Sequence, residues 1–190
     1  MTGIFEQDKI FDRCDFAGEA LPKGEYECCT FTNCNFANGD LSEFKFIECE
    51  FKFCNLSLTK INKTMFQNIK FQDCKMLGLR FDQCNPFGLS FSFLNCQLNH
   101  SSFYKTKIKK SVFKNCQLQE VDFAECDLSQ AIFDQCDLLK AIFENTVLEQ
   151  VDFRTAHNFT IDPELNRIRK AKFSLNGVPG LLDKYDIDIS

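Results

Sequence analysis

The sequence predicts an all-β solenoid of stacked coils, and two features of the chain lead to this prediction. From Cys116 to Phe153 every fifth residue is Leu or Phe, and the residue two places before each of them is small or modest in size. A period of five fits neither the turn of a helix nor the alternation of a strand. A short fixed repeat indicates coils that bury their apolar sides against one another. The composition of 23 Phe and no Trp agrees, because one recurring interior position selects one side chain.

The five-residue count starts at Phe11 and marks the centre position of each repeat. It runs to Phe91 with Pro86 as its one departure from a large hydrophobic residue, and it resumes at Leu98 after a unit of seven residues. We therefore expect an insertion of two residues near 87–96, which forms the only seam in the repeat.

The cysteine spacing tests this count independently. One set of Cys is separated by 20 residues throughout, except for a separation of 22 that falls on the seam: Cys14, Cys34, Cys54, Cys74, Cys96, Cys116 and Cys136. Four repeats then make one four-sided coil, and these thiols stack in one column as small hydrophobic groups. The same count predicts a column of aromatic residues: Phe11, Phe31, Phe51, Phe71, Phe91, Phe113, Phe133 and Phe153.

The chain divides into a repeat region, residues 1–155, and a C-terminal segment, residues 156–190, that caps the last coil or joins two subunits. We expect a short helix over 178–185 and a strand over 186–189. The segment is too apolar for a free tail, because it carries a group of large hydrophobic side chains: Leu181, Leu182, Tyr185, Ile187 and Ile189.

Several functional classes are not expected from this sequence. The N-terminus lacks the basic and apolar regions of a signal peptide, and no apolar run is long enough to span a membrane. We therefore expect a cytoplasmic protein with reduced thiols. Zinc-type cysteine spacing and phosphate-binding glycine loops are absent, and Cys96 should point inward, away from His100. No catalytic residue, metal site or cofactor is predicted, and the chain is not expected to be an enzyme.

Charge is segregated along the chain. The net charge is −7 over residues 1–50, +9 over 51–116 (the basic band), −8 over 117–152 (the acidic band) and +1 over 153–190. One interpretation is a solvated surface that keeps a rod in solution. The other is a binding surface, since acidic side chains continue the two faces on which the basic band lies: Asp122, Glu125, Asp127 and Glu144 after Lys60, Lys63, Arg80, Lys105, Lys107, Lys109 and Lys110.

Over roughly residues 10–155 the repeat pattern resembles that of the pentapeptide-repeat proteins. This resemblance implies a right-handed quadrilateral β-helix with Leu or Phe at the centre position and a small residue two places before it. The tail, with 151–153, 161–168 and 181–182 followed by an alternating segment, is similar to the topoisomerase-protecting branch of the family, the Qnr and microcin B17 immunity proteins.

The narrower resemblance implies a function, a partner and an assembly. The chain would be a non-enzymatic mimic of B-DNA that binds DNA gyrase or topoisomerase IV and protects it from a quinolone or microcin type of poison. Asp122, Glu125, Asp127 and Glu144 would form the partner-binding surface. A homodimer would form through the C-terminal segment, with Leu181, Leu182, Tyr185 and Ile187 at its interface.

One alternative function stays open, and a second is disfavoured. A pentapeptide-repeat scaffold with a non-topoisomerase target uses the same rigid surface, because a fold does not determine function. Direct DNA binding through the basic band is not expected, since the Phe side chains that would stack on bases lie inside. The basic band and the lack of long inserted loops also distinguish the chain from a uniformly acidic Qnr-type rod.

Overall fold

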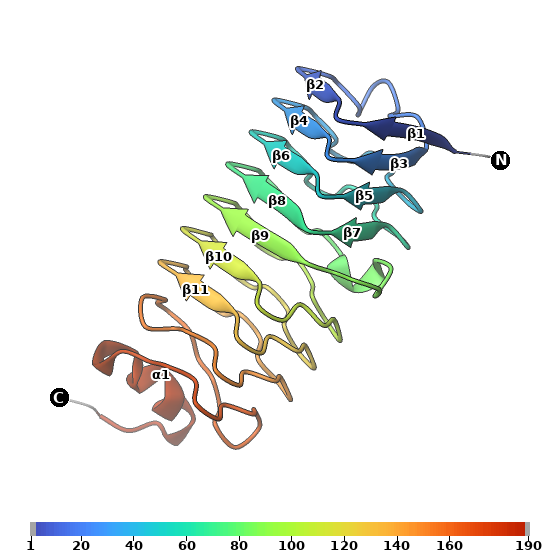
Figure 1. Ribbon diagram of the computed structural model, residues 1–190. Coiled ribbons are helices and arrows are strands. Elements are labelled where there is room, and N and C mark those ends of the chain that lie inside the picture. Colours follow the sequence, from blue (N-terminus) through green and yellow to red (C-terminus); the bar gives the residue numbers. More distant parts are fainter. Residues whose placement is uncertain (1–2, 189–190) are drawn as a thin grey trace.

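The computed structural model describes residues 3–188 and forms a parallel β-solenoid whose coils stack along one axis (Figure 1). One sheet has the strand order β1-β3-β5-β7 and the other the order β11-β10-β9-β8-β6-β4-β2. The remaining sides of the coils are joined by isolated parallel bridges such as Asn35↔Asn55 and Lys107↔Asp127. The predicted all-β solenoid with a spacing of 20 residues is confirmed.

The regular elements are short, because each side of a coil is only one repeat long. The strands are β1 (Ile4–Gln7), β2 (Ile10–Asp12), β3 (Gly24–Glu27), β4 (Thr30–Thr32), β5 (Lys45–Ile47), β6 (Glu50–Lys52), β7 (Met65–Gln67), β8 (Ile69–Gln72), β9 (Phe91–Leu94), β10 (Val112–Lys114) and β11 (Ile132–Asp134). The helical elements are η1 (Phe81–Gln83), η2 (Leu175–Gly177), α1 (Pro179–Leu182) and η3 (Asp183–Tyr185), of which η1, η2 and η3 are 3-10 turns.

The core is a set of aromatic columns that run along the solenoid axis. The rings of Phe31 and Phe51 stack with centroids 4.8 Å apart, and those of Phe113 and Phe133 are also 4.8 Å apart. This distance equals the roughly 4.7–4.9 Å between hydrogen-bonded strands. Backbone pairing and ring stacking therefore require the same repeat, and each fully buried Phe contributes about 1.5–3 kcal/mol by leaving water.

The predicted cysteine column also lies inside, apart from the half-buried Cys14, and its thiols are free. Each thiol sits over backbone carbonyls: Cys54 Sγ is 3.4 Å from the carbonyl oxygen of Phe31 and 3.3 Å from that of Lys52. Cys74 repeats the arrangement one coil later, at 3.3 Å from the carbonyl of Phe51. These contacts agree with thiols that act as small packing groups and weak donors.

The corners of the coil are residues in the left-handed conformation, two places after each centre residue. Lys105, Asn115 and Glu125 have φ angles of 58°, 52° and 55°. Such a conformation costs roughly 1–2 kcal/mol in a residue with a side chain. Each corner N–H donates to the next coil, as from Lys105 to the carbonyl of Ala124 at 3.0 Å. The corners thus project their side chains outward, which puts the charges of the sequence at the outermost points of the coil.

At the seam the structure corrects the predicted register. β9 pairs with β8 so that Phe93 lies beside Phe71, and the rings of Phe93 and Phe113 stack at 4.9 Å. Phe93 therefore occupies the column position assigned to Phe91. Asn85 N–H still bonds the carbonyl of Thr64, whereas Ile69 N–H bonds that of Ser90, so the two extra residues lie between Asn85 and Ser90.

The sequence count failed here because a unit of seven residues with several Phe allows more than one register. Pro86 was assigned to an interior centre position, but it is exposed, and Leu89 is buried instead. Phe91 packs edge-on against Phe81, with ring centroids 5.2 Å apart, and fills the remaining space. Gly88 has a φ of 71° and permits the sharp turn that the insertion requires.

The coil geometry continues into the C-terminal segment before helices cover its end (Figure 1). A bridge joins Asp152 to Lys172, and the rings of Phe153 and Phe173 stack at 5.4 Å. The short helix expected over 178–185 is present as α1 and η3. The strand expected over 186–189 is wrong for residues 186–188, which form no strand, and Ile189 lies outside the described residues.

The tail is held to the last coil by an ion-pair cluster. Lys184 Nζ lies 2.7 Å from an Asp162 carboxylate oxygen and 2.8 Å from one of Glu164. Tyr185 Oη donates to Glu164 at 3.2 Å. The backbone adds a bond from Ile161 N–H to the carbonyl of Gly180 at 2.9 Å. These contacts place the helices over the end of the core.

Replacing one ring of the aromatic column tests the stacking directly. Phe113→Ala is expected to lower the free energy of unfolding by about 3–5 kcal/mol, because it leaves a cavity between the rings of two neighbouring coils. Urea denaturation monitored by circular dichroism measures the loss. Ile132→Ala is the control, since Ile132 is 42% exposed and its truncation should cost less than about 1 kcal/mol. Equal losses in the two variants would contradict a core built on ring stacking.

Candidate functional site

The four acidic residues predicted to bind a partner lie around one corner of the solenoid, within two successive coils. Asp122 forms bridges to Ser102 on one side and Ile142 on the other. Glu125 is the corner residue of the same coil, and its N–H donates to the carbonyl of Glu144 at 2.8 Å. Asp127 lies just beyond the corner, between Lys107 and Val147 in the adjoining ladder. The structure therefore brings the four side chains to one region, while their role in binding stays a prediction.

Two of the four carboxylates are paired with lysines of the basic band. Glu125 lies 3.4 Å from Lys105 Nζ, and Asp127 lies 3.0 Å from Lys109 Nζ. Tyr104, which the sequence pattern did not single out, donates its hydroxyl to Glu125 at 3.0 Å. The ion pair between Lys105 and Glu125 could have been predicted from the sequence, because the two residues are 20 positions apart.

Asp122 and Glu144 differ from Glu125 and Asp127, because they have no lysine partner among the described residues. Within residues 3–188 neither of them takes part in an ion pair at 4.0 Å or less, although Asp122 accepts the N–H of Ala124 at 2.9 Å. The acidic set thus has a part paired with lysines, Glu125 and Asp127, and, within that range, a part without ion pairs, of which Asp122 lies in the same coil as Glu125 and Glu144 in the next coil. Ile142, 44% exposed, lies beside Asp122 in the ladder and adds an apolar contact surface.

The environment of Asp127 favours its charged form. Partial burial acts to raise the pKa of this carboxyl, but bonds from Ser129 and the Lys109 ammonium outweigh it and hold the pKa below its usual value. The Ser129 hydroxyl donates at 2.6 Å and the Ser129 N–H at 3.1 Å. Asp127 is therefore a fixed, ionised group and contributes to the shape of the corner as much as to its net charge.

The basic band reaches this corner through continuous ladders. Lys60 bridges to Asp40 in one ladder, and Arg80 bridges to Ser102, which is followed by Asp122. Arg80 is itself paired with Asp82, with Nε and Nη2 donating at 2.9 and 2.8 Å. Acidic side chains therefore lie on both sides of the basic residues in this direction: Asp40 is bridged to Lys60, and Asp122 is separated from Arg80 by Ser102 alone.

The predicted dimerisation residues divide into a packed pair and an exposed pair. Leu181 packs against the core, and Leu182 is half-buried. Tyr185 and Ile187 are 52% and 56% exposed. Exposed apolar side chains that the sequence pattern did not single out lie in the same segment: Leu165, Leu175 and Val178. The segment therefore caps the coil and also presents apolar surface, and its role in dimerisation stays a prediction.

Other chemical constellations are sparse in the described part of the chain. His100 Nδ1 lies 3.3 Å from Glu120, on the surface, while Cys96 is buried. Among residues 3–188 no group of three or more His, Cys, Asp or Glu side chains is placed to hold a metal ion. No helix in that range has the length and apolar character needed to cross a bilayer.

Comparison with known proteins identifies the repeat. The family model described as a pentapeptide repeat region matches residues 89–158, and the model described as pentapeptide repeats in eight copies matches residues 27–62. Among curated proteins no match is found.

Solved structures with a similar course of the chain include two of QnrB1, a plasmid-mediated fluoroquinolone resistance protein. The full-length protein is 18% identical, with 97% of this chain and 100% of that chain covered and a TM-score of 0.48. A trypsin-treated variant is 22% identical, with 100% and 99% covered and a TM-score of 0.48. HetL, involved in heterocyst differentiation regulation in the cyanobacterium Nostoc sp. strain PCC 7120, is 14% identical, with 93% and 89% covered and a TM-score of 0.42.

Removing the lysine partner of Asp127 should change the acid stability of the protein. A carboxyl whose pKa is lowered by folding stabilises the folded state above its unfolded pKa of about 3.9 and loses this contribution as the pH falls through the folded pKa. Lys109→Met is expected to raise the pKa of Asp127 towards its usual value. The stability difference between wild type and variant should then be present at pH 6 and shrink as the pH approaches 2.

Urea denaturation at a series of pH values measures this difference, with Lys110→Met as the control on the neighbouring corner. A difference that stays constant from pH 6 to pH 2 would show that Lys109 stabilises the fold by packing alone.

Proposed function

The chain belongs to the pentapeptide-repeat family, and we propose that it is a non-enzymatic cytoplasmic protein that binds DNA gyrase or topoisomerase IV in place of DNA and protects the enzyme from a poison. The observation that carries this proposal is the gathering of Asp122, Glu125, Asp127 and Glu144 around one corner within two coils. Their positions follow a rigid backbone repeat, so the carboxylates meet a partner without being ordered first.

The spacing of the charges suits a surface that normally holds duplex DNA. Successive coils of a parallel β structure lie about 4.8 Å apart, and duplex DNA carries one negative charge per roughly 1.7 Å of axis. Several carboxylates per coil on adjoining faces bring the charge density of the acidic band towards that of DNA. The net charge of −8 over residues 117–152 is the largest negative charge of the four bands.

Asp122 and Glu144 take the main role in contact with the partner. Glu125 and Asp127 already have lysine partners at 3.4 and 3.0 Å, and these lysines partly neutralise the two carboxylates. Exposed ion pairs of this kind are weak, of the order of 0.2–1 kcal/mol, so a strongly basic partner can replace the lysines. Ile142, the ladder partner of Asp122 in the next coil, adds apolar area beside it.

A homodimer through the C-terminal segment extends the acidic surface. The exposed Tyr185 and Ile187 lie beyond the last coil, close in sequence to the acidic band of residues 117–152. A two-fold axis through this end would place the two acidic bands on either side of it, with the basic bands farther out. The most negative part of the assembly would then lie at its centre.

A scaffold with a non-topoisomerase target is the second candidate, and the mixed charge of the surface favours it. The basic band carries +9 over residues 51–116, and carboxylates flank it: Asp40 is bridged to Lys60, and Ser102 bridges both Arg80 and Asp122. Such a pattern complements a partner that itself presents both signs of charge. The two candidates differ in whether duplex DNA competes with the chain for its target.

Supercoiling by gyrase, with and without a quinolone or microcin B17, tests the proposal. The purified protein is expected to inhibit or protect the enzyme at micromolar concentration. The variant Asp122→Asn, Glu125→Gln, Glu144→Gln is expected to require about tenfold more protein, because three weak charge contacts are removed. The effect should weaken as salt is raised, since exposed charges are screened.

The matched control removes three carboxylates near the other end of the rod, Asp8→Asn, Glu27→Gln and Glu48→Gln, and should act like the wild type. Equal activity of all three proteins would exclude the acidic corner as the contact surface. Absence of any effect on a cognate gyrase and on topoisomerase IV would exclude the topoisomerase proposal and favour the scaffold.

The assembly is tested by changing one exposed tail residue. Ile187→Glu is expected to convert a dimer into a monomer in light scattering, because it places a charge in an apolar interface. Leu139→Glu is the control, since Leu139 is 44% exposed in the repeat region, outside the C-terminal segment. A mass that is the same in the wild type and both variants would count against the tail as an interface.

A further inference from the structure

The two ends of the solenoid are finished differently. At the C-terminal end the helices η2, α1 and η3 cover the last coil, and Phe159 packs on Phe173 with ring centroids 5.7 Å apart. At the other end β1 is the terminal strand of one sheet and β2 the terminal strand of the other. Within residues 3–188 no element lies across these two strands (Figure 1).

The terminal strands therefore present backbone groups to the outside. Residues of a parallel strand point their N–H and C=O alternately to one neighbour and the other. Ile4 and Asp8 donate to the carbonyls of Lys23 and Glu27 in the second coil. By this alternation Phe5 and Gln7 of β1 direct their backbone groups away from β3. An uncovered edge of this kind accepts a further strand.

The side chains at this edge are apolar and accessible. Phe5 is 57% exposed, Ile4 39% and Ile10 77%. Phe11 and Phe16, whose counterparts in the next coil are fully buried, are only partly buried here. The N-terminal end of the core is thus uncovered, whereas every later coil is covered by the coil before it.

Glu6 stands where the repeat would place an aromatic ring. Its register partners in the following coils are Tyr26, Phe46 and Phe66, all interior and buried. Glu6 itself is half-buried in β1, and among the described residues 3–188 its carboxylate enters no ion pair at 4.0 Å or less. A charge directed over the end of an apolar column disfavours an apolar strand and selects one with a basic side chain at that position.

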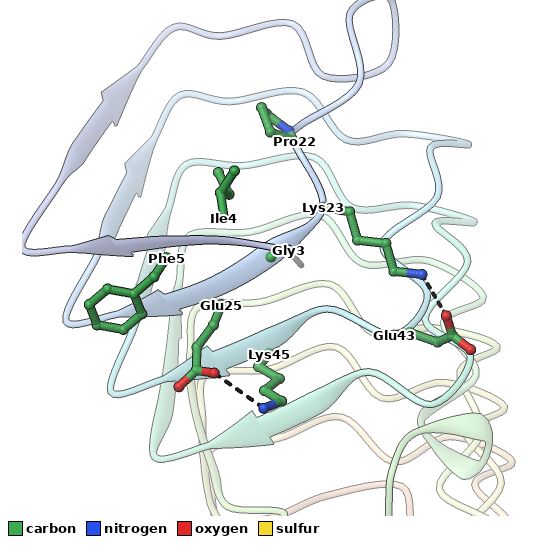
Figure 2. A pocket seen from close by; sticks show the side chains of 9 residues that line it. Gly3, Ile4, Phe5, Pro22, Lys23, Glu25, Glu43 and Lys45 are labelled. Carbon is green, nitrogen blue, oxygen red and sulfur yellow. Dashed lines mark hydrogen bonds and ion pairs between the residues drawn. The ribbon is translucent and has the colours of Figure 1, made fainter. Parts of the chain in front are cut away.

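An open hollow of about 540 Å³ adjoins the edge on the outer side of β1 and β3. Figure 2 shows Phe5, Pro22 and Gly3 around it, with the ion pair Glu25–Lys45 below Gly3 and the ion pair Lys23–Glu43 to the right. Glu25 lies 3.2 Å from Lys45. Gly24 lies so close to Ile4 that a Cβ there would meet the Ile4 carbonyl, so a glycine at this position lets β1 approach β3.

We propose that this N-terminal edge binds an extended segment of a partner protein by strand addition, with a basic side chain of the segment facing Glu6 and an apolar side chain beside Phe5. The edge supplies the main-chain bonds, and the alternation of inward and outward positions supplies the selectivity. The first coil carries five carboxylates and two cations over residues 3–20, which also favours a basic segment.

A second copy of the chain fits this edge less well. Antiparallel pairing of β1 with another β1 through the outward-facing backbone groups of both Phe5 and Gln7 aligns Phe5 with Gln7 of the second copy and Glu6 with its own counterpart. Like charges directly opposite each other destabilise a strand pair. This edge lies at the end of the rod remote from the acidic band, so strand addition here is independent of topoisomerase binding.

Binding of labelled peptides to the full chain tests the proposal by fluorescence anisotropy. The probe is fluorescein-Ser-Val-Lys-Val-Ser amide, which places Lys on one side of a strand and Val on the other. It is expected to bind at least about fivefold more tightly than the same peptide with Glu in place of Lys. Methylation of the Lys nitrogen and both Val nitrogens should abolish binding, because it removes the main-chain donors that can face β1 in either strand direction.

A charge swap locates the site. In Glu6→Lys the preference should reverse in favour of the Glu peptide, while Glu19→Lys, on another side of the same coil, should keep the preference of the wild type. Circular dichroism shows whether both variants remain folded. Phe5→Ser is expected to weaken both peptides without reversing the preference.

Undetectable binding, or a preference unchanged by Glu6→Lys, would overturn the proposal. Self-association of the wild type that Phe5→Ser abolishes would overturn it as well, by assigning the edge to a second copy of the chain.

Discussion

Stacking of inward aromatic rings at the spacing of hydrogen-bonded strands is the constraint on which this structure depends. Phe11, Phe31 and Phe51 stack with centroids 4.8 Å apart, and the same contact recurs at 4.8 Å between Phe113 and Phe133. A coil one residue longer would move its ring out of the column and its backbone out of register at once. The outer side chains inherit this repeat, so residues 20 apart in sequence become neighbours on the surface.

This constant spacing of 20 residues explains which features could be predicted from the sequence and which could not. The columns of Cys and Phe were predictable because the coil length is constant, and the Lys105–Glu125 pair follows from the same arithmetic. The seam was not, because a seven-residue unit with Phe87, Phe91 and Phe93 admits more than one alignment. Only packing against Phe71 and Phe81 decides it. In the tail the helix over 178–185 was predictable, but the continuation of the coil as far as Phe173 and the absence of a strand over 186–188 were not, because the sequence there departs from the regular repeat.

The surface combines the charge bands in a way that composition alone did not indicate. The basic and acidic bands meet at a corner where Lys105 and Lys109 partly neutralise Glu125 and Asp127. In the proposed complex, Asp122 and Glu144 keep their charge for the partner. The open N-terminal edge, with Glu6 over the end of an aromatic column, is a second surface of different chemistry. A rigid rod can therefore present a charged side and a strand-binding end at the same time.

Site-specific photo-crosslinking in living cells tests the central claim, that the acidic corner contacts a type II topoisomerase. A benzoylphenylalanine at Ala124 lies between Asp122 and Glu125, while one at Ala37 occupies the equivalent place in a repeat on a face free of the acidic set. We expect a crosslink from position 124 to a subunit of gyrase or topoisomerase IV and none from position 37. Equal crosslinking from both positions, or a crosslink from position 124 only to an unrelated protein, would contradict the claim.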